Sequence, residues 1–196
     1  MQSEILLDCN MKKILVLTAM LFSSLFLSAQ DAETIFKTIE NGSARKGDFV
    51  VKFAECRMFP GKDKVDLTGD LVFKPDTFLS MIYTNKEKFI IDGSKMVIIR
   101  DGQNQVLDLT KNIMMRGLSH ALLYSFQGKL PLLAKEQSAD ITAAKDGKDY
   151  VVTLIAKKKM VKGISRLTVK YNQVTGAIKD MLMEEFGGNR TYYKVL

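Results

Sequence analysis

Leu67–Tyr83, LTGDLVFKPDTFLSMIY, holds two apolar segments separated by a lysine and a proline. In the first segment apolar residues alternate with polar ones, which is the period of a β-strand with one face in solvent. Pro75 has no backbone N–H to donate, so it ends this strand without leaving a ladder hydrogen bond unmade. The stretch therefore predicts two consecutive strands of an antiparallel sheet.

Further strands are predicted on both sides of this pair. Residues 49–58, FVVKFAECRM, alternate in the same way, and the runs KFIID, KMVIIRD and QVLDLT follow the pair. Asn85-Lys86, Asp92-Gly93 and Asp101-Gly102 join these runs, and such dipeptides tolerate the positive φ of tight hairpins. Residues 139–196 hold five more runs, ADITAAK, DYVVTLIAKKK, ISRLTVKYN, IKDMLMEEF and TYYKVL. The pattern predicts a meander of about ten short strands.

Two segments have helical spacing instead. Residues 31–40 combine an acidic first turn with an apolar stripe, and Asn41-Gly42 is expected to end this helix. Residues 112–127, NIMMRGLSHALLYSFQ, are apolar over more than half of the helical girth, and Gly128 breaks the helix. The predicted fold class is therefore mainly β (α+β): an incomplete antiparallel β-barrel, or half-barrel, with helices covering its concave hydrophobic face.

The first thirty residues predict export. Two lysines precede an apolar run at residues 14–27 and small residues follow it, as in a cleaved secretory signal peptide, and residues 1–10 form an upstream extension. The apolar run is shorter than the roughly 20 residues that cross a bilayer. We expect a periplasmic protein that is not membrane-spanning. Residues 31–196 hold no Pro-rich or Ser-rich linker and are expected to form a single domain.

The composition limits the partners. Removing residues 1–30 takes away two lysines and two acidic residues, so the net charge stays at +7. Export and the even spread of basic residues argue against nucleic acid as a partner. Cys56 is the only cysteine after residue 30, so no internal disulfide is expected. We expect a monomer with no cofactor.

His120 is the only histidine, and this limits catalysis. A metal site with several histidines is excluded, and any histidine-based general acid or base would have to be this residue. Ser119 precedes it on one predicted helix, where adjacent positions do not share a face. The sequence has no phosphate-binding or dinucleotide-binding glycine loop. We therefore predict that the chain is not an enzyme.

Methionines are gathered on the predicted helix and strands, at Met114 and Met115 and at Met81, Met96, Met181 and Met183. Their flexible, polarisable side chains suit a surface that accepts variable apolar shapes. Ordinary core packing is the alternative for each of them. Together with the apolar helix they favour a site for an acyl chain between helix and sheet.

Three parts of the chain resemble the LolA-type periplasmic carriers of outer-membrane lipoproteins. Leu67–Tyr83 is similar to the family's G-x-L-x-x-x-R-P-x-x-F stretch, and Phe89–Val106, FIIDGSKMVIIRDGQNQV, is similar to its D-G-K-x-L-W-x-Y-x-P hairpin. Asp149–Val195 looks like the family's closing meander, with a turn before each strand. The chain departs from the pattern at Lys74, where the family has arginine.

The resemblance implies a helical lid over a hydrophobic cavity that takes the acyl chains of a lipoprotein. It also implies a basic residue before the strand proline that bonds to the closed lid, which here is Lys74. The implied partners are an inner-membrane lipoprotein-releasing transporter and an outer-membrane acceptor. The residues expected to line the cavity and lid are Phe49, Phe53, Leu71, Phe73, Phe78, Met81, Ile82, Ile98, Met114, Met115, Leu118 and Leu122.

The resulting hypothesis is a soluble carrier that moves lipoproteins from the inner to the outer membrane by lid opening. A LolA-like glycolipid-binding or lipid-binding protein, or an envelope sensor module with no carrier role, is the alternative, because fold does not fix function. A third possibility is a filled structural domain with no cavity. In that case a charge buried at Leu118 or Leu122 would simply unfold the chain.

Overall fold

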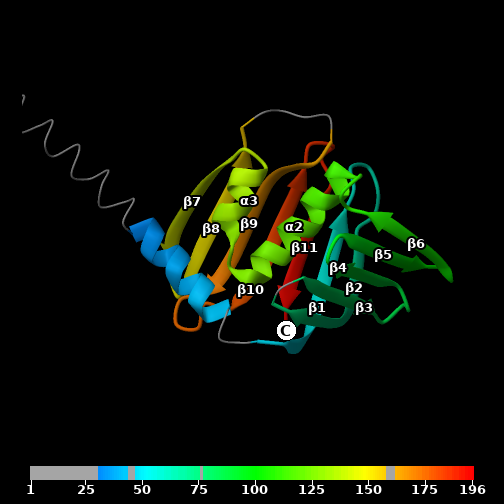
Figure 1. Cartoon of the computed structure of the whole chain (residues 1–196), viewed down its shortest axis with the longest axis horizontal. Coiled ribbons are helices and arrows are strands. Elements are labelled where there is room, and N and C mark those ends of the chain that lie inside the picture. Colours follow the sequence, from blue (N-terminus) through cyan, green and yellow to red (C-terminus); the bar gives the residue numbers. More distant parts are fainter. Residues whose placement is uncertain (1–30, 44–46, 76, 158–161) are drawn as a thin grey trace, which may run out of the picture.

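The computed structural model describes residues 31–43, 47–75, 77–157 and 162–196, and Figure 1 shows their arrangement. The predicted extension and signal peptide, residues 1–30, lie outside the described residues. The described residues form one antiparallel sheet with helices on one of its faces. The strands are β1 (Phe49–Met58), β2 (Val65–Lys74), β3 (Phe78–Tyr83), β4 (Lys88–Asp92), β5 (Lys95–Arg100), β6 (Gln103–Asp108), β7 (Ala139–Asp146), β8 (Asp149–Ala156), β9 (Ile164–Asn172), β10 (Ile178–Glu185) and β11 (Arg190–Val195).

The sheet joins two meanders at its centre. The order of its eleven strands is β6-β5-β4-β3-β2-β1-β11-β10-β9-β8-β7, so among the described residues the first strand pairs with the last. In this pairing Phe53 lies opposite Val195. β6 and β7 are the two edges, and the sheet is not closed into a barrel. The predicted fold class, a half-barrel with helices over its concave face, is confirmed.

The hairpins turn where the sequence predicts them. Asp101 and Gly102, between β5 and β6, have φ angles of 52° and 74°, and Gly93, between β4 and β5, has a φ of 57°. Two consecutive residues with positive φ are what a type I′ turn requires, and its twist matches that of the flanking strands. In the hairpin between β3 and β4 the positive φ falls on Lys86.

Two helices of the chain's middle cover the concave face. α2 (Ile113–Gln127) starts at Asn112, whose side chain accepts a hydrogen bond from the Met115 amide at 3.1 Å. It ends at Gly128, which has a φ of 72° and donates back to the last turn. Both caps satisfy backbone groups that a helix end leaves unpaired. α3 (Leu130–Glu136) follows directly, and Figure 1 shows α2 and α3 lying over the sheet.

A further helix covers residues 31–43 and runs through the Asn41-Gly42 pair that was expected to end it. Gly42 is required there by packing, because a Cβ at this position would lie 2.2 Å from the Thr175 carbonyl oxygen. Gly128 also lies close to this helix, since a Cβ there would be 2.9 Å from the Glu40 Cα. The helix is therefore packed backbone to backbone against the β9–β10 turn and the end of α2.

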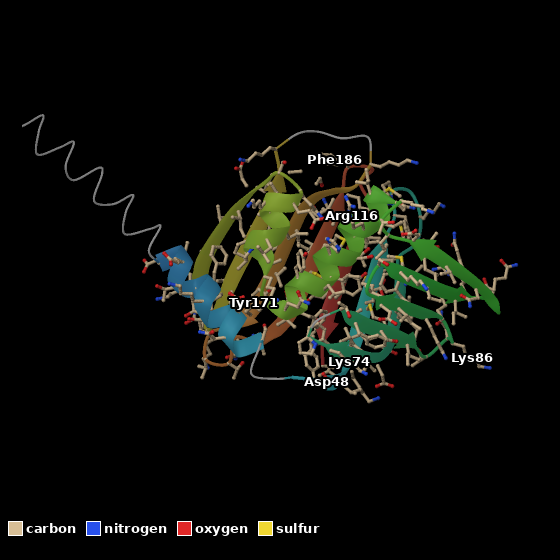
Figure 2. The ribbon with its side chains drawn as sticks, viewed as in Figure 1. Asp48, Lys74, Lys86, Arg116, Tyr171 and Phe186 are labelled. Carbon is tan, nitrogen blue, oxygen red and sulfur yellow. The ribbon has the colours of Figure 1, made fainter. Side chains whose placement is uncertain are left out.

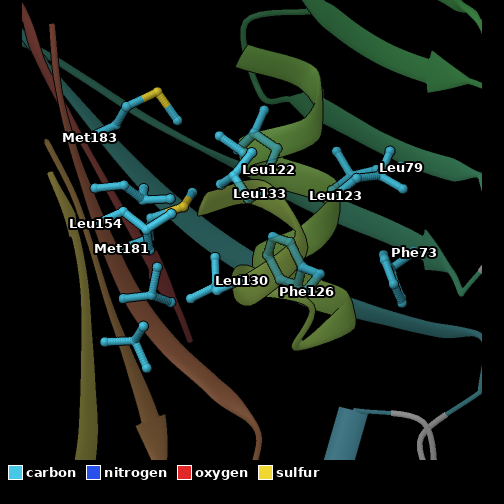
Figure 3. Close-up of a cluster of buried hydrophobic side chains, with 14 of the residues drawn as sticks. Phe73, Leu79, Leu122, Leu123, Phe126, Leu130, Leu133, Leu154, Met181 and Met183 are labelled. Atoms are coloured by element: carbon cyan, nitrogen blue, oxygen red, sulfur yellow. The ribbon is translucent and has the colours of Figure 1, made fainter. Parts of the chain in front are cut away.

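Alternation along each strand separates a concave face, under the helices, from a convex face. α2 sends side chains to both halves of the concave face, as Figure 3 shows: Leu122 points toward Met183 on β10, and Leu123 toward Leu79 on β3. Phe126 packs against Phe73 of β2, with ring centroids 5.8 Å apart. The helix thus lies between the two meanders and fills the hollow of the half-barrel.

The middle of the concave face is closely packed. Leu79, Met96 and Met181 have an exposed fraction of 0%. A side chain beside an open space large enough for water would keep some exposed surface, so the side chains of α2 and α3 fill this region. An acyl chain can reach it only after a helix has moved.

Candidate functional site

The C-terminal half of α2 is anchored to the sheet by buried polar contacts. The hydroxyl of Tyr171, on β9, donates to the Ser125 carbonyl at 2.8 Å, and both side chains are fully buried. Burial raises the pKa of the Tyr171 hydroxyl, so it stays protonated and keeps donating. The side-chain amide of Gln127 donates to the carbonyl oxygen of Pro75, just after β2. These contacts hold this end of α2 on both meanders.

The N-terminal half of α2 is more loosely covered. Ile113 and Met114 are 72% and 48% exposed, and Met115 and Leu118 are half-buried against the core. Figure 1 shows this end of α2 on the side of β4, β5 and β6. Exposed apolar side chains cost free energy in water, about 25 cal/mol for each Å². This half of the helix therefore has less burial to lose if it moves.

Most of the residues expected in the site lie together under or on α2. On the sheet they are on the concave face, and on the helix they pack against the core: Phe49, Phe53, Leu71, Phe73, Met81, Ile98, Met115, Leu118 and Leu122. Phe49 joins Phe73 at 5.1 Å and Phe126 at 6.3 Å between ring centroids. The largest aromatic group of the site therefore lies beside the anchored end of α2.

Three of the expected residues lie elsewhere. Phe78 and Ile82 alternate with the buried Leu79 and Met81 on β3, so they lie on the convex face, away from α2. Ile82 borders a shallow hollow of about 180 Å³ there, which is smaller than the roughly 300 Å³ of the smallest common ligand pockets. Met114 is on the exposed side of α2. These positions do not face the space between helix and sheet.

Lys74, the residue expected to bond to the lid, is also on the convex face. It is exposed, and its ammonium nitrogen lies 5.4 Å from the centroid of the Phe78 ring. In Figure 2 it lies in the lower part of the molecule, whereas Arg116, on the N-terminal half of α2, lies in the upper part. At this corner the side-chain amide of Gln127 contacts the Pro75 carbonyl oxygen, which joins the strand end to the helix. The role of Lys74 in holding the helix stays a prediction.

A buried charged group that the sequence analysis missed lies on the concave face. Glu55, on β1, is 3% exposed, and its two carboxylate oxygens accept from Arg57 Nε and from the Tyr83 hydroxyl, each at 2.5 Å. The Arg57 guanidinium lies 5.4 Å from the centroid of the Tyr83 ring. Burial and the Glu55 carboxylate raise the pKa of Tyr83, which stays a donor. Strand alternation carried that signal, since Glu55 and Arg57 continue the inward series of Phe49, Val51 and Phe53.

This group continues to the surface through a second carboxylate. Glu87 lies 3.6 Å from Arg57 Nη1 and 3.2 Å from Arg100 Nε, measured to its carboxylate oxygens. Arg100 is exposed over about half of its side chain. Glutamate and arginine side chains therefore alternate, in the order Glu55, Arg57, Glu87 and Arg100, from the core to the rim of the concave face.

The side chains of Ser119 and His120 contact other residues of α2 and α3. The Ser119 hydroxyl donates to the Met115 carbonyl at 2.8 Å, within α2. The His120 Nδ1 lies 2.7 Å from a carboxylate oxygen of Glu136, on α3, and Arg116 lies 3.8 Å from the same carboxylate. These two residues do not face each other as a nucleophile and its base would. The His120–Glu136 contact joins α2 to α3, whereas the Ser119 contact lies within α2.

None of the helices in the described residues has the length and apolar character needed to cross a bilayer. No family model matches the chain, and no curated protein is similar to it in sequence.

Solved structures similar to this chain come from several bacteria. A LolA superfamily protein of Nitrosomonas europaea is 10% identical, with 84% of this chain and 91% of that chain covered and a TM-score of 0.43. A putative outer membrane lipoprotein-sorting protein domain of Vibrio parahaemolyticus is 12% identical, with coverages of 85% and 91% and a TM-score of 0.44. The lipoprotein LppX of Mycobacterium tuberculosis is 13% identical, with coverages of 84% and 94% and a TM-score of 0.40.

Proposed function

We propose that this protein binds acyl chains between α2 and the concave face of the sheet, and that it carries the acyl chains of lipoproteins through the periplasm from the inner to the outer membrane. One observation carries the proposal. α2 covers an apolar concave face, is anchored to the sheet at its C-terminal end through Tyr171 and Gln127, and has a half-exposed apolar N-terminal half. Such a helix can open at one end without leaving the protein.

The energies of closing and opening are compatible with exchange. Lifting the N-terminal half of α2 exposes half-buried Met115 and Leu118 and the sheet residues under them, at about 1.5–3 kcal/mol for each large side chain that was fully buried. An acyl chain of about 14 methylenes gains on the order of 11 kcal/mol when it leaves water. The ligand therefore replaces the helix as the cover of the concave face, and the helix returns when the ligand is passed on.

The carrier role, as distinct from lipid binding, rests on the predicted signal peptide and on the family resemblance. In this role the protein works as a periplasmic monomer without a cofactor or a catalytic step. It receives its cargo from an inner-membrane lipoprotein-releasing transporter and gives it to an outer-membrane acceptor.

Native mass spectrometry of protein purified from the cell envelope tests lipid binding. We expect mass adducts that match acylated molecules and that organic extraction removes. Leu118→Asp places a charge on the half-buried face of α2 and is expected to reduce the occupied fraction several-fold, because a carboxylate beside an acyl chain loses its hydration. Leu132→Asp is the matched control, since Leu132 is 52% exposed on α3. A wild-type protein free of adducts, or equal occupancy in both variants, contradicts the proposal.

The anchor of α2 is tested by comparing Gln127→Leu with Lys74→Ala. Gln127→Leu removes the donor to Pro75 at a contact worth about 1 kcal/mol, so α2 can lift at its C-terminal end as well, and we expect bound lipid to exchange up to about fivefold faster. Lys74→Ala tests the side chain that the family resemblance assigns to this task. Exchange of a fluorescent fatty acid, followed by stopped flow, measures both. Acceleration by Lys74→Ala and none by Gln127→Leu would assign the anchor to Lys74.

A further inference from the structure

We propose that Arg57 and Arg100 form a binding site for the oxyanion at the head of an acyl-chain ligand, and that Glu87 occupies this site when no ligand is bound. The inference rests on the proposed lipid binding alone and not on the lipoprotein cargo, whose ester- and amide-linked acyl chains carry no oxyanion. It names a carboxylate or phosphate carried on an apolar chain as the chemical class of the ligand. The site lies on the concave face. Arg57 is on the same side of β1 as Phe53, Glu87 comes two residues before Phe89, and Arg100 comes two residues after Ile98.

Glu87 is held more loosely than its buried counterpart. Its carboxylate oxygens lie 3.2 and 3.3 Å from nitrogens of Arg100 and 3.6 Å from Arg57 Nη1. Charge-assisted hydrogen bonds are normally about 2.7–2.9 Å long. By contrast, Glu55 lies 2.5 Å from Arg57 Nε. The outer N–H groups of both arginines are therefore positioned for an oxyanion that approaches more closely than Glu87 does.

Displacing Glu87 leaves the buried part of the group intact. Glu55 keeps its donors from Arg57 and Tyr83, so its charge stays compensated when Glu87 moves. Glu87 belongs to the hairpin between β3 and β4, where its side chain is partly exposed and can turn into water. Without Glu87, the two arginines and Glu55 together carry one net positive charge. A single oxyanion restores the balance, and the planar guanidinium groups suit it because they donate in pairs.

The apolar neighbours of this site favour an amphiphile over a free anion. Phe89 and Ile98 pair across β4 and β5, next to Glu87 and Arg100 on the concave face, and both are half-buried. The same face continues inward to Ile91 and Met96, which are fully buried. A ligand with its head on the arginines would therefore lay its chain along the apolar row that α2 covers.

Matched ligand pairs test the inference by equilibrium dialysis: oleate with oleyl alcohol, and oleoyl lysophosphatidic acid with monoolein. The wild type is expected to bind the anionic member of one or both pairs about tenfold more tightly, as one added charge-assisted contact would give. Arg100→Gln is expected to remove this preference. Glu87→Gln is expected to increase it several-fold, because the competing carboxylate is lost. The pair that responds identifies carboxylate or phosphate as the head.

Arg190→Gln is the matched control. Arg190 lies on the convex face, is 59% exposed against 54% for Arg100, and pairs with Glu184 at 3.1 Å. It is expected to keep the wild-type preference, and thermal unfolding confirms that each variant is folded. Equal binding of charged and neutral ligands by the wild type, or a preference that survives Arg100→Gln, overturns the inference while lipid binding stands. If neither member of either pair binds, the proposed lipid binding itself fails.

Discussion

Arg57→Met is expected to lower the free energy of unfolding by about 3–5 kcal/mol, because it leaves the buried Glu55 carboxylate without its counter-ion. The methionine fills most of the arginine's volume, so little of the loss comes from a cavity. The Tyr83 hydroxyl remains as a donor to Glu55, but one neutral donor does not balance a buried charge. Urea unfolding followed by circular dichroism measures the change.

The double variant Glu55→Leu with Arg57→Met separates the charge from the packing. Two apolar side chains in place of a buried ion pair are often close to neutral for stability, so the double variant is expected to recover most of the loss. Arg166→Met is the surface control, since Arg166 is 53% exposed and lies 3.8 Å from Glu184. A loss below about 1 kcal/mol for Arg57→Met would contradict the account of Glu55 and Arg57 as a stabilising buried ion pair.

Gly42→Ala is expected to cost about 3 kcal/mol, because the added methyl group meets backbone that has no room to move. Its Cβ would lie 2.2 Å from the Thr175 carbonyl oxygen and 2.6 Å from the Gly176 Cα. The helix of residues 31–43 would have to lift off the β9–β10 turn and would lose the burial of Ile35 and Ile39. Thermal and urea unfolding measure the loss.

Gly93→Ala separates close packing from backbone conformation. Gly93 has a φ of 57° and open space around its Cβ position, so its replacement costs only the left-handed conformation, about 1–2 kcal/mol. Gly42 is not in that region, and its replacement costs only the contact. Equal losses at the two positions would contradict the packing argument for Gly42.

The order of the secondary structure could be predicted from the sequence because its signals are local. Alternation gave the strands, and Asp-Gly pairs such as Asp101-Gly102 gave the hairpins. The same local signal failed at Gly42, where glycine serves close packing instead of ending a helix. The pairing of β1 with β11 joins residues far apart in the sequence, such as Phe53 and Val195, and no local pattern indicates such a contact.

The candidate site could be predicted only in part, for reasons that differ between residues. On β3 both faces carry large apolar side chains, so alternation could not decide that Leu79 faces inward and Phe78 outward. Gln127 looks like an ordinary polar residue at a helix end until the fold brings Pro75 beside it. Strand alternation places Glu55 and Arg57 on the inward face of β1. They were missed because charged side chains are rarely found in a core.

The open edges of the sheet have a consequence for how copies of this protein behave at high concentration. An unpaired edge strand can template the addition of a strand from another molecule, which leads to aggregation. β6 is only six residues long and carries Gln103, Asn104 and Asp108, and β7 carries charged residues at both of its ends. Short or polar edge strands of this kind discourage strand addition, so the protein can avoid aggregation although its sheet is not closed into a barrel.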